Sequence, residues 1–229
     1  MAIRAVTFDV YSALYDARAG LTRAIKALFD RRGIAGDPQD IARTWREKQR
    51  EYLLTANSLD REAASNRRAI VAAAGYALRR LEPPPTAEEM RALAAAWEQL
   101  PPWPEVGEVL QKVRRQSLIL ATLSNGDAAM LRALVANLPV TFDHIISTEG
   151  GRFKPHPSVY RKTLDTLGVS ADELLHVAGS PTDAMGATSV GIRTIWINRM
   201  GDAVVDTRFS PAYQSPDLRG VIDVLDALR

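Results

Sequence analysis

Polar side chains suited to catalysis occur in four short segments of the sequence, and each segment follows a run of mostly apolar residues. The segments supply a carboxylate, a hydroxyl beside an amide, a lysine, and a second hydroxyl and carboxylate: Asp9, Ser124, Asn125, Lys154, Ser180 and Asp183. A carboxylate acts as a nucleophile or as an acid–base group, and a lysine beside it orients it and neutralises negative charge. Hydroxyl and amide groups bind the oxygens of an anion. Together, and in this order after strand-like runs, these residue types predict an active site.

The composition restricts the chemistry to these groups. The chain has 229 residues, with no cysteine and only three histidines. The absence of cysteine excludes disulfides, thiolate metal sites and a cysteine nucleophile. An aspartate carboxylate, with an ordinary pKa of about 3.9, is ionised at neutral pH and is therefore available as a nucleophile.

The elements that must position these residues alternate between strand and helix. Short apolar runs typical of buried strands span residues 3–10, 117–123, 144–148, 174–178 and 193–198. Strands separated by helical stretches predict an α/β fold, with a doubly wound parallel sheet and helices on both faces. Ligands bind beyond the carboxyl ends of the strands in such sheets. We therefore expect the four polar segments to converge at that edge.

The segment between the first two strand-like runs has a different pattern. Residues 17–97 are almost entirely helical in pattern, and one predicted helix spans residues 58–81. This layout predicts two domains. A Rossmann-like core of residues 1–16 and 98–229 is interrupted after its first strand by a helical cap of residues 17–97.

Neither charge nor hydropathy indicates a nucleic acid or a membrane as a partner. The chain has 29 basic and 27 acidic residues, a formal net charge of +2, and no basic tract. No apolar run approaches the ~20 residues of a membrane-spanning helix, and a strand pattern instead of a signal peptide follows the first residues. We expect a soluble, cytoplasmic protein that binds neither nucleic acid nor membrane.

The motifs around the polar segments resemble those of the haloacid dehalogenase superfamily, and within it the type II L-2-haloacid dehalogenases. The resemblance covers essentially the whole chain and rests on FDVYSAL (8–14), TWREKQREY (44–52), LSNG (123–126), FKPHPSVY (153–160), VAGSPTDAMGA (177–187) and WINR (196–199). It implies a hydrolase that removes the halogen of a small 2-haloacid with an aspartate nucleophile, through a covalent ester and without a metal or other cofactor. Dimers are common in this family, which makes a homodimer an expectation.

The resemblance also implies a role for each site residue. Asp9 is expected to be the nucleophile, Lys154 to orient it, and Asp183 to orient Lys154 and help activate water. Substrate contacts are expected from Tyr11, Arg46, Ser124, Asn125, Tyr160 and Ser180. Tyr11 stands where phosphatases of the superfamily carry a second aspartate, which protonates the leaving oxygen; a halide leaves without a proton.

Four positions depart from the dehalogenase pattern. Ala13 replaces a threonine, and Arg50 stands where the cap usually has an apolar residue. Ser180 and Thr182 replace an asparagine and a tryptophan. These changes predict a more polar pocket, and hence a different acid substrate or weak dehalogenase activity. Two alternatives stay open: a magnesium-dependent phosphatase of the same superfamily, and a binding protein of this fold with impaired catalysis.

Overall fold

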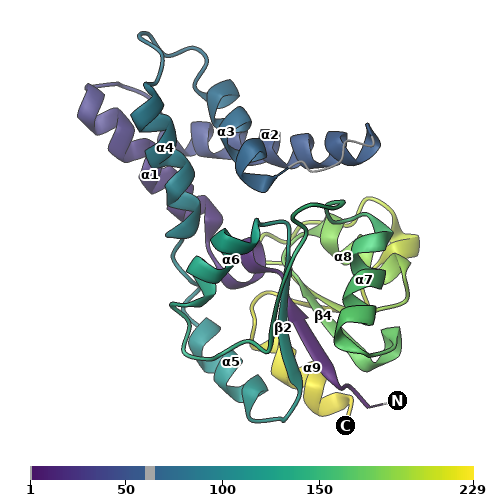
Figure 1. The fold of residues 1–229 in the computed structure, drawn as a ribbon. Helices are drawn as coiled ribbons and strands as arrows, with labels where there is room; N and C mark the ends of the chain where they lie inside the picture. Colours follow the sequence, from purple (N-terminus) through teal and green to yellow (C-terminus); the bar gives the residue numbers. More distant parts are fainter. Residues whose placement is uncertain (1, 60–64) are drawn as a thin grey trace.

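A parallel sheet forms the centre of the molecule in the computed structural model, which describes residues 2–59 and 65–229 (Figure 1). The strands are β1 (Ala5–Phe8), β2 (Ile119–Ser124), β3 (His144–Ser147), β4 (Leu174–Ala178), β5 (Arg193–Ile197) and β6 (Tyr213–Ser215). They are hydrogen-bonded in the order β3-β2-β1-β4-β5-β6, and all neighbouring pairs are parallel. The chain therefore winds in opposite directions on the two sides of β1, which confirms the doubly wound α/β fold.

Helices cover both faces of this sheet because its strands are buried on both sides. They are α5 (Val106–Arg114), α6 (Ala128–Val135), α7 (Pro157–Leu167), α8 (Pro181–Ser189) and α9 (Gly220–Ala227). Val6 and Phe8 of β1 belong to one apolar cluster with residues of α5, α6 and α9. Ala5, on the opposite face of the same strand, belongs to a second cluster with residues of α7 and α8. This alternation along β1 places α5, α6 and α9 on one face and α7 and α8 on the other.

Four further helices lie over the carboxyl ends of the strands (Figure 1). These cap helices are α1 (Ala17–Arg32), α2 (Pro38–Ser58), α3 (Asn66–Ala77) and α4 (Ala87–Ala95). Trp45 and Trp97 are fully buried and pack edge to face, with ring centroids 5.9 Å apart. Trp97 makes the same kind of contact with Tyr11, at 5.4 Å. The aromatic cluster therefore extends from the cap helices to the segment that follows β1.

The structure corrects two sequence-based expectations. The helix predicted to begin at Ser58 does not begin there: α2 ends at Ser58, and α3 begins after Ser65, whose side chain accepts a hydrogen bond from the Arg68 amide. Residues 60–62, which belonged to that prediction, lie outside the described residues. A sixth strand, β6, adds to the five predicted. Its sequence, YQS, is short, polar and only partly buried, so it lacks the apolar run that marked the other strands.

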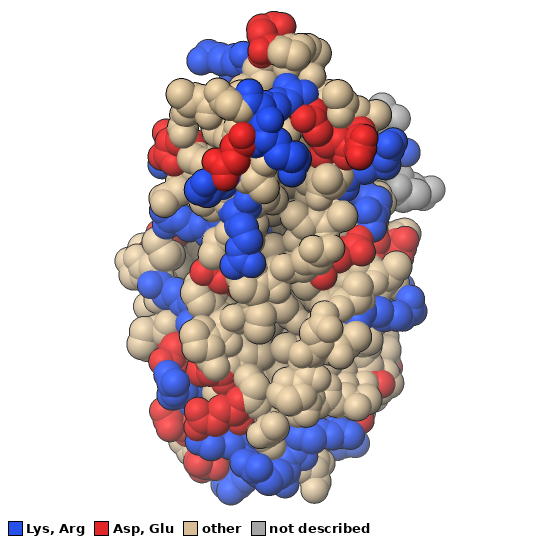
Figure 2. Space-filling view, turned by 90° about the vertical axis from the view of Figure 1, so that its left-hand side faces the viewer, with Lys and Arg blue, Asp and Glu red and all other residues tan. Residues whose placement is uncertain are grey.

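Charged side chains of both signs lie on the surface of the molecule (Figure 2). Lys and Arg side chains are interspersed with Asp and Glu on the face shown in Figure 2. Within residues 2–59 and 65–229, no helix has the length and apolar character needed to span a membrane.

Gly179 allows the segments after β1 and β4 to approach closely. A Cβ atom at this position would lie 2.4 Å from the Ala13 nitrogen and 2.6 Å from the Ser12 carbonyl carbon. We expect Gly179→Ala to lower the free energy of unfolding by about 1–3 kcal/mol, because backbone atoms must move to make room. Gly75→Ala serves as the control: nothing lies within 4 Å of its Cβ position on helix α3. It should stabilise the protein by about 0.5–1 kcal/mol. Equal effects of both substitutions in urea unfolding would contradict this interpretation.

Candidate active site

The carboxylate of Asp9 is held in one orientation by three donors. Asp9 follows β1 and precedes a π-helical turn, η1 (Val10–Leu14). The Ser12 amide donates a hydrogen bond to Oδ2 at 3.1 Å. Ser124 Oγ and Lys154 Nζ donate to Oδ1 at 3.1 and 3.0 Å. The residue is almost fully buried, so these contacts fix the direction in which the carboxylate points.

Lys154 is buried between two carboxylates. Its Nζ donates to Asp9 Oδ1 at 3.0 Å, to Asp183 Oδ2 at 2.7 Å and to the Leu123 carbonyl at 2.8 Å. Burial by itself would lower the pKa of Lys154, but the charges of Asp183 and Asp9 outweigh it and raise the pKa above its ordinary value. Lys154 is therefore a permanent cation whose three donors are all used within the protein.

Asp183 is the second carboxylate of this arrangement. Its Oδ2 accepts from Lys154 and lies 3.1 Å from His176 Nε2, and its Oδ1 accepts from the Tyr160 hydroxyl at 2.8 Å. Burial would raise the pKa of Asp183, but the charge of Lys154 and the hydrogen bonds hold it well below its usual range. Because the ionised carboxylate can only accept, His176 Nε2 is the donor in this pair, and His176 Nδ1 lies 2.9 Å from Thr7 Oγ1.

Two residues expected to contact substrate lie instead against the charged groups. Asn125 accepts from the Lys154 amide at 2.7 Å and donates to the Lys154 carbonyl at 3.1 Å, so its side chain holds the backbone of Lys154. Tyr160 is fully buried, contacts Asp183 and is not among the residues that line the pocket. Asn125, unlike Tyr160, also lines the pocket, so of these two residues only Asn125 is placed to contact a ligand there.

Ser180 and Tyr11 both line the pocket, in different states of hydrogen bonding. Ser180 Oγ accepts from the Asp183 amide at 3.3 Å and caps the beginning of α8. The Tyr11 hydroxyl is buried and has no hydrogen-bond partner within the described residues. Burial raises the pKa of Tyr11, so the hydroxyl keeps its proton.

Arg46 reaches the site from α2. Its guanidinium donates to Ser12 Oγ at 3.1 Å and to Gln49 Oε1 at 2.8 Å, and lies 5.2 Å from the centroid of the Trp97 ring. Burial, followed by the nearby charge of Arg50, lowers the pKa of Arg46 to about 10. Arg46 is therefore still a cation at neutral pH.

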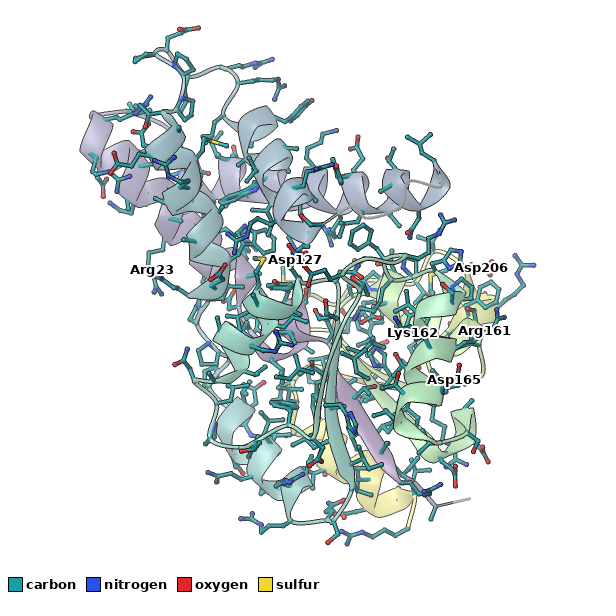
Figure 3. All side chains as sticks on the ribbon, in the orientation of Figure 1. Arg23, Asp127, Arg161, Lys162, Asp165 and Asp206 are labelled. Carbon is teal, nitrogen blue, oxygen red and sulfur yellow. The ribbon has the colours of Figure 1, made fainter. Side chains whose placement is uncertain are left out.

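A chain of hydrogen-bonded polar groups joins Arg46 on α2 to Asp127 at the edge of the sheet. Gln49 Nε2 donates to Asn66 Oδ1 at 2.5 Å, and both side chains are buried. The Asn66 and Arg67 amides donate to Asp127 Oδ1 and Oδ2 at 2.7 and 3.2 Å. Asp127 precedes α6, and Figure 3 shows it directly below the cap helices. Its carboxylate therefore binds the N-terminus of α3 and ties that helix to the sheet edge.

Sequence reasoning did not assign site roles to His176, Gln49, Asn66 or Asp127. A lone histidine within a strand, or an amide within a helix, has no motif of its own. The Asp127 side chain follows the LSNG motif at the start of a helix, where an aspartate usually caps its own helix. Here it binds the N-terminus of α3 instead, and this contact depends on tertiary structure.

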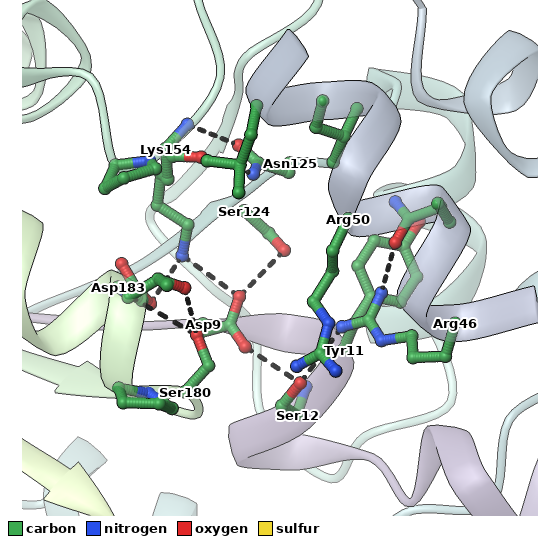
Figure 4. A pocket seen from close by; sticks show the side chains of 16 residues that line it. Asp9, Tyr11, Ser12, Arg46, Arg50, Ser124, Asn125, Lys154, Ser180 and Asp183 are labelled. Atoms are coloured by element: carbon green, nitrogen blue, oxygen red, sulfur yellow. Dashed lines mark hydrogen bonds and ion pairs between the residues drawn. The ribbon is translucent and has the colours of Figure 1, made fainter. Parts of the chain in front are cut away.

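These groups enclose a pocket of about 180 Å³ between α2 and the strand ends (Figure 4). Its lining is Asp9, Tyr11, Ser12, Arg46, Gln49, Arg50, Leu53, Leu54, Ser124, Asn125, Lys154, Pro155, Ser180, Pro181, Thr182 and Asp183. The structure therefore brings Asp9, Lys154 and Asp183 together at the pocket floor, opposite Arg46. A buried carboxylate facing a guanidinium suits the binding of a small anion next to a nucleophile.

The oxygen atoms at the pocket floor do not offer enough free ligands for a divalent cation. Asp183 accepts protein hydrogen bonds at both carboxylate oxygens, and the Lys154 ammonium lies between Asp183 and Asp9. The described residues contain no group of three or more His, Asp or Glu side chains able to hold a metal ion. A magnesium ion needs several free oxygen ligands, and it would have to displace the ammonium to obtain them.

Stability is expected to depend on pH through Asp183. Its folded pKa lies below the ordinary aspartate value of about 3.9, so the unfolded chain takes up the proton first as the pH falls. The stabilisation from this carboxylate is present above the unfolded pKa and is lost as the pH falls toward the folded pKa. In Asp183→Asn, this decrease in stability at low pH should be absent. Its free energy of unfolding should change by about 1 kcal/mol less than that of the wild type between about pH 6 and pH 3. Equal changes in urea titrations would contradict this.

Comparison of the sequence with known proteins identifies the family of this chain. The model of the family described as haloacid dehalogenase-like hydrolase matches residues 3–191. Haloacetate dehalogenase H-2 of Moraxella sp. (strain B) is 31% identical over 99% of this chain and 96% of its own length. The (S)-2-haloacid dehalogenase of Pseudomonas sp. (strain YL) is 31% identical over 98% of this chain and 95% of its own.

A solved structure shows the same fold over the whole chain. The L-2-haloacid dehalogenase of Xanthobacter autotrophicus, with chloropropionic acid covalently bound, superposes with a TM-score of 0.86 at 28% identity. The match covers 99% of this chain and 100% of that one. The chain therefore belongs to the haloacid dehalogenase-like hydrolases and is an enzyme, a hydrolase.

Proposed function

We propose that this hydrolase removes the halogen of small 2-haloacids, with Asp9 as the nucleophile and an ester of Asp9 as the intermediate. The observation that carries the proposal is the position of the Asp9 carboxylate, buried at the pocket floor and oriented by Lys154 and Ser124. The names of the relatives support it, since they act on haloacetate and on (S)-2-haloacids. The relative with covalently bound chloropropionic acid supports a covalent step.

In the first step, Asp9 Oδ2 attacks C2 of the substrate. Oδ1 accepts two hydrogen bonds from side chains, whereas Oδ2 accepts one, from the Ser12 amide. Oδ2 therefore keeps an electron pair for the new bond to carbon. The halide departs with the electron pair of the carbon–halogen bond and needs no proton. Arg46 binds the substrate carboxylate or receives the halide.

In the second step, water adds to the carbonyl carbon of the ester. Oδ1 is then the carbonyl oxygen that becomes negative, and it already faces the donors of Lys154 and Ser124. The bond between that carbon and Oδ2 breaks, which releases a 2-hydroxy acid and restores the Asp9 carboxylate. Water gives up one proton as it adds, and Oδ2 takes one up as it leaves as the hydroxyl oxygen of the product; we assign this transfer to Asp183, which lines the pocket beside Lys154. The second proton of the water is lost to solvent when the Asp9 carboxyl ionises again.

The proposed reaction uses no metal ion and no other cofactor. Lys154 supplies, within the protein, the positive charge that a magnesium-dependent phosphatase takes from its ion. Tyr11 stands two residues after Asp9, so no second acid is present there to protonate an alkoxide leaving group. Both observations favour a halide over the alkoxide of a phosphate ester as the leaving group.

Other expectations from the sequence remain proposals. We propose that residues 1–16 and 98–229 form a core domain and residues 17–97 a cap domain. A small anionic substrate is the proposed partner. A homodimer and a cytoplasmic location stay predictions.

Asp9→Asn should abolish turnover of 2-chloropropionate. The amide cannot form the ester, so we expect kcat for chloride release to fall by at least about a thousandfold. Asp30→Asn, which changes an exposed acid on α1, is the matched control and should keep full activity.

Chloride release by the wild type should be the same with EDTA as with added magnesium. Phosphate release from p-nitrophenyl phosphate that requires magnesium, without chloride release, would contradict the proposed function. Full activity of Asp9→Asn would contradict the role of Asp9.

A further inference from the structure

Two arginines project from one side of α2 into the pocket. Arg46 and Arg50 are four residues apart, which places them about one helical turn, or 6 Å, apart along the axis of α2. Both line the pocket that contains Asp9. Figure 4 shows the Arg50 guanidinium beside that of Arg46, with Ser12 below them and Asp9 to the left.

Neither guanidinium forms an ion pair with a carboxylate of the cap helices among the described residues. The hydrogen-bond acceptors of Arg46 are a hydroxyl, on Ser12, and an amide, on Gln49. No ion pair joins Arg50 to a carboxylate of the described residues. The neighbouring charge of Arg50 contributes to the lowered pKa of Arg46, which shows that the two guanidiniums repel each other. An anion that binds both would relieve this repulsion.

The two carboxylates on the pocket floor, Asp9 and Asp183, do not form ion pairs with these arginines. Asp183 accepts hydrogen bonds from Lys154 and Tyr160, and Asp9 shares the same ammonium. A monocarboxylic substrate held by Arg46 would leave Arg50 facing the pocket without an anion. The Arg50 guanidinium lies beside that of Arg46, where a second anionic group of the same substrate would meet it.

We propose that the substrate is a 2-halo dicarboxylic acid whose second carboxylate binds Arg50, while Arg46 binds the carboxylate next to the halogen or receives the halide. This inference rests on the proposed function. The reaction is the same displacement: a 2-halosuccinate would give 2-hydroxysuccinate, halide and one proton. Arg50 is exposed, so water and salt screen its contribution, and the preference it creates should weaken as the salt concentration rises.

The test compares binding of two unreactive probes, succinate and propionate, by titration calorimetry at low salt. Wild type should bind succinate about tenfold more tightly than propionate, as expected for one charge-assisted contact. Arg50→Leu should lose this preference, and Arg50→Lys should keep part of it. Arg43→Leu is the control, because Arg43 lies on the same helix but is exposed and paired with Asp40. It should keep the wild-type preference. Equal affinities in the wild type, or a preference retained in Arg50→Leu, would overturn the proposal.

Halide release from 2-chlorosuccinate and 2-chloropropionate separates this inference from the proposed function. The ratio of kcat/KM for the two substrates should favour 2-chlorosuccinate and fall about tenfold in Arg50→Leu. A ratio that Arg50→Leu leaves unchanged, with chloride released from both, would overturn the dicarboxylate substrate alone. A uniform loss with both substrates would assign Arg50 to the departing halide and would also overturn it. Chloride release from neither compound would overturn the proposed function and this inference together.

Discussion

The buried ammonium of Lys154 is the interaction on which the site depends. It bridges Asp9 and Asp183, which would otherwise be two buried carboxylates close together. Removing one partner of a buried ion pair usually costs about 3–5 kcal/mol, because a charge is left without compensation. The same contacts fix the orientation of Asp9 and supply positive charge at its Oδ1 atom. The stability of the site and the proposed chemistry therefore both depend on the ion pairs of Lys154 with Asp9 and Asp183. Asn125 holds the backbone of Lys154, and His176 contacts Asp183.

The position of α2 determines what the pocket binds. This helix carries Arg46 and Arg50 into the pocket, and Gln49 links it to the N-terminus of α3. Asp127 then ties α3 to the edge of the sheet. Because these contacts are buried and directional, they set where the guanidiniums stand relative to Asp9. In the proposed reaction, the catalytic groups come from the edge of the sheet and the two arginines from α2, so a substitution on α2 should change substrate preference and leave the nucleophile in place.

Much of this arrangement was predictable from the sequence, for a physical reason. Parallel strands bring their carboxyl ends to one edge, so residues that follow apolar runs, such as Asp9 and Lys154, had to meet there. The parts that were missed depend on contacts between distant segments. His176 reads as an ordinary strand residue, and only the packing of β1 against β4 places it between Thr7 and Asp183. In the same way, the placement of Tyr160 behind Asp183 follows from how α7 packs on α8.

The most direct test of the account is to follow the oxygen of water through a single turnover. Excess enzyme would react with 2-chloropropionate in oxygen-18-labelled water, and the peptide containing Asp9 and the 2-hydroxypropionate would be analysed by mass spectrometry. If Asp9 forms the ester and water attacks its carbonyl carbon, the label enters the Asp9 carboxylate and the product hydroxyl stays unlabelled. Label in the product hydroxyl, with none in Asp9, would show that water attacks the substrate directly and would contradict the nucleophilic role of Asp9.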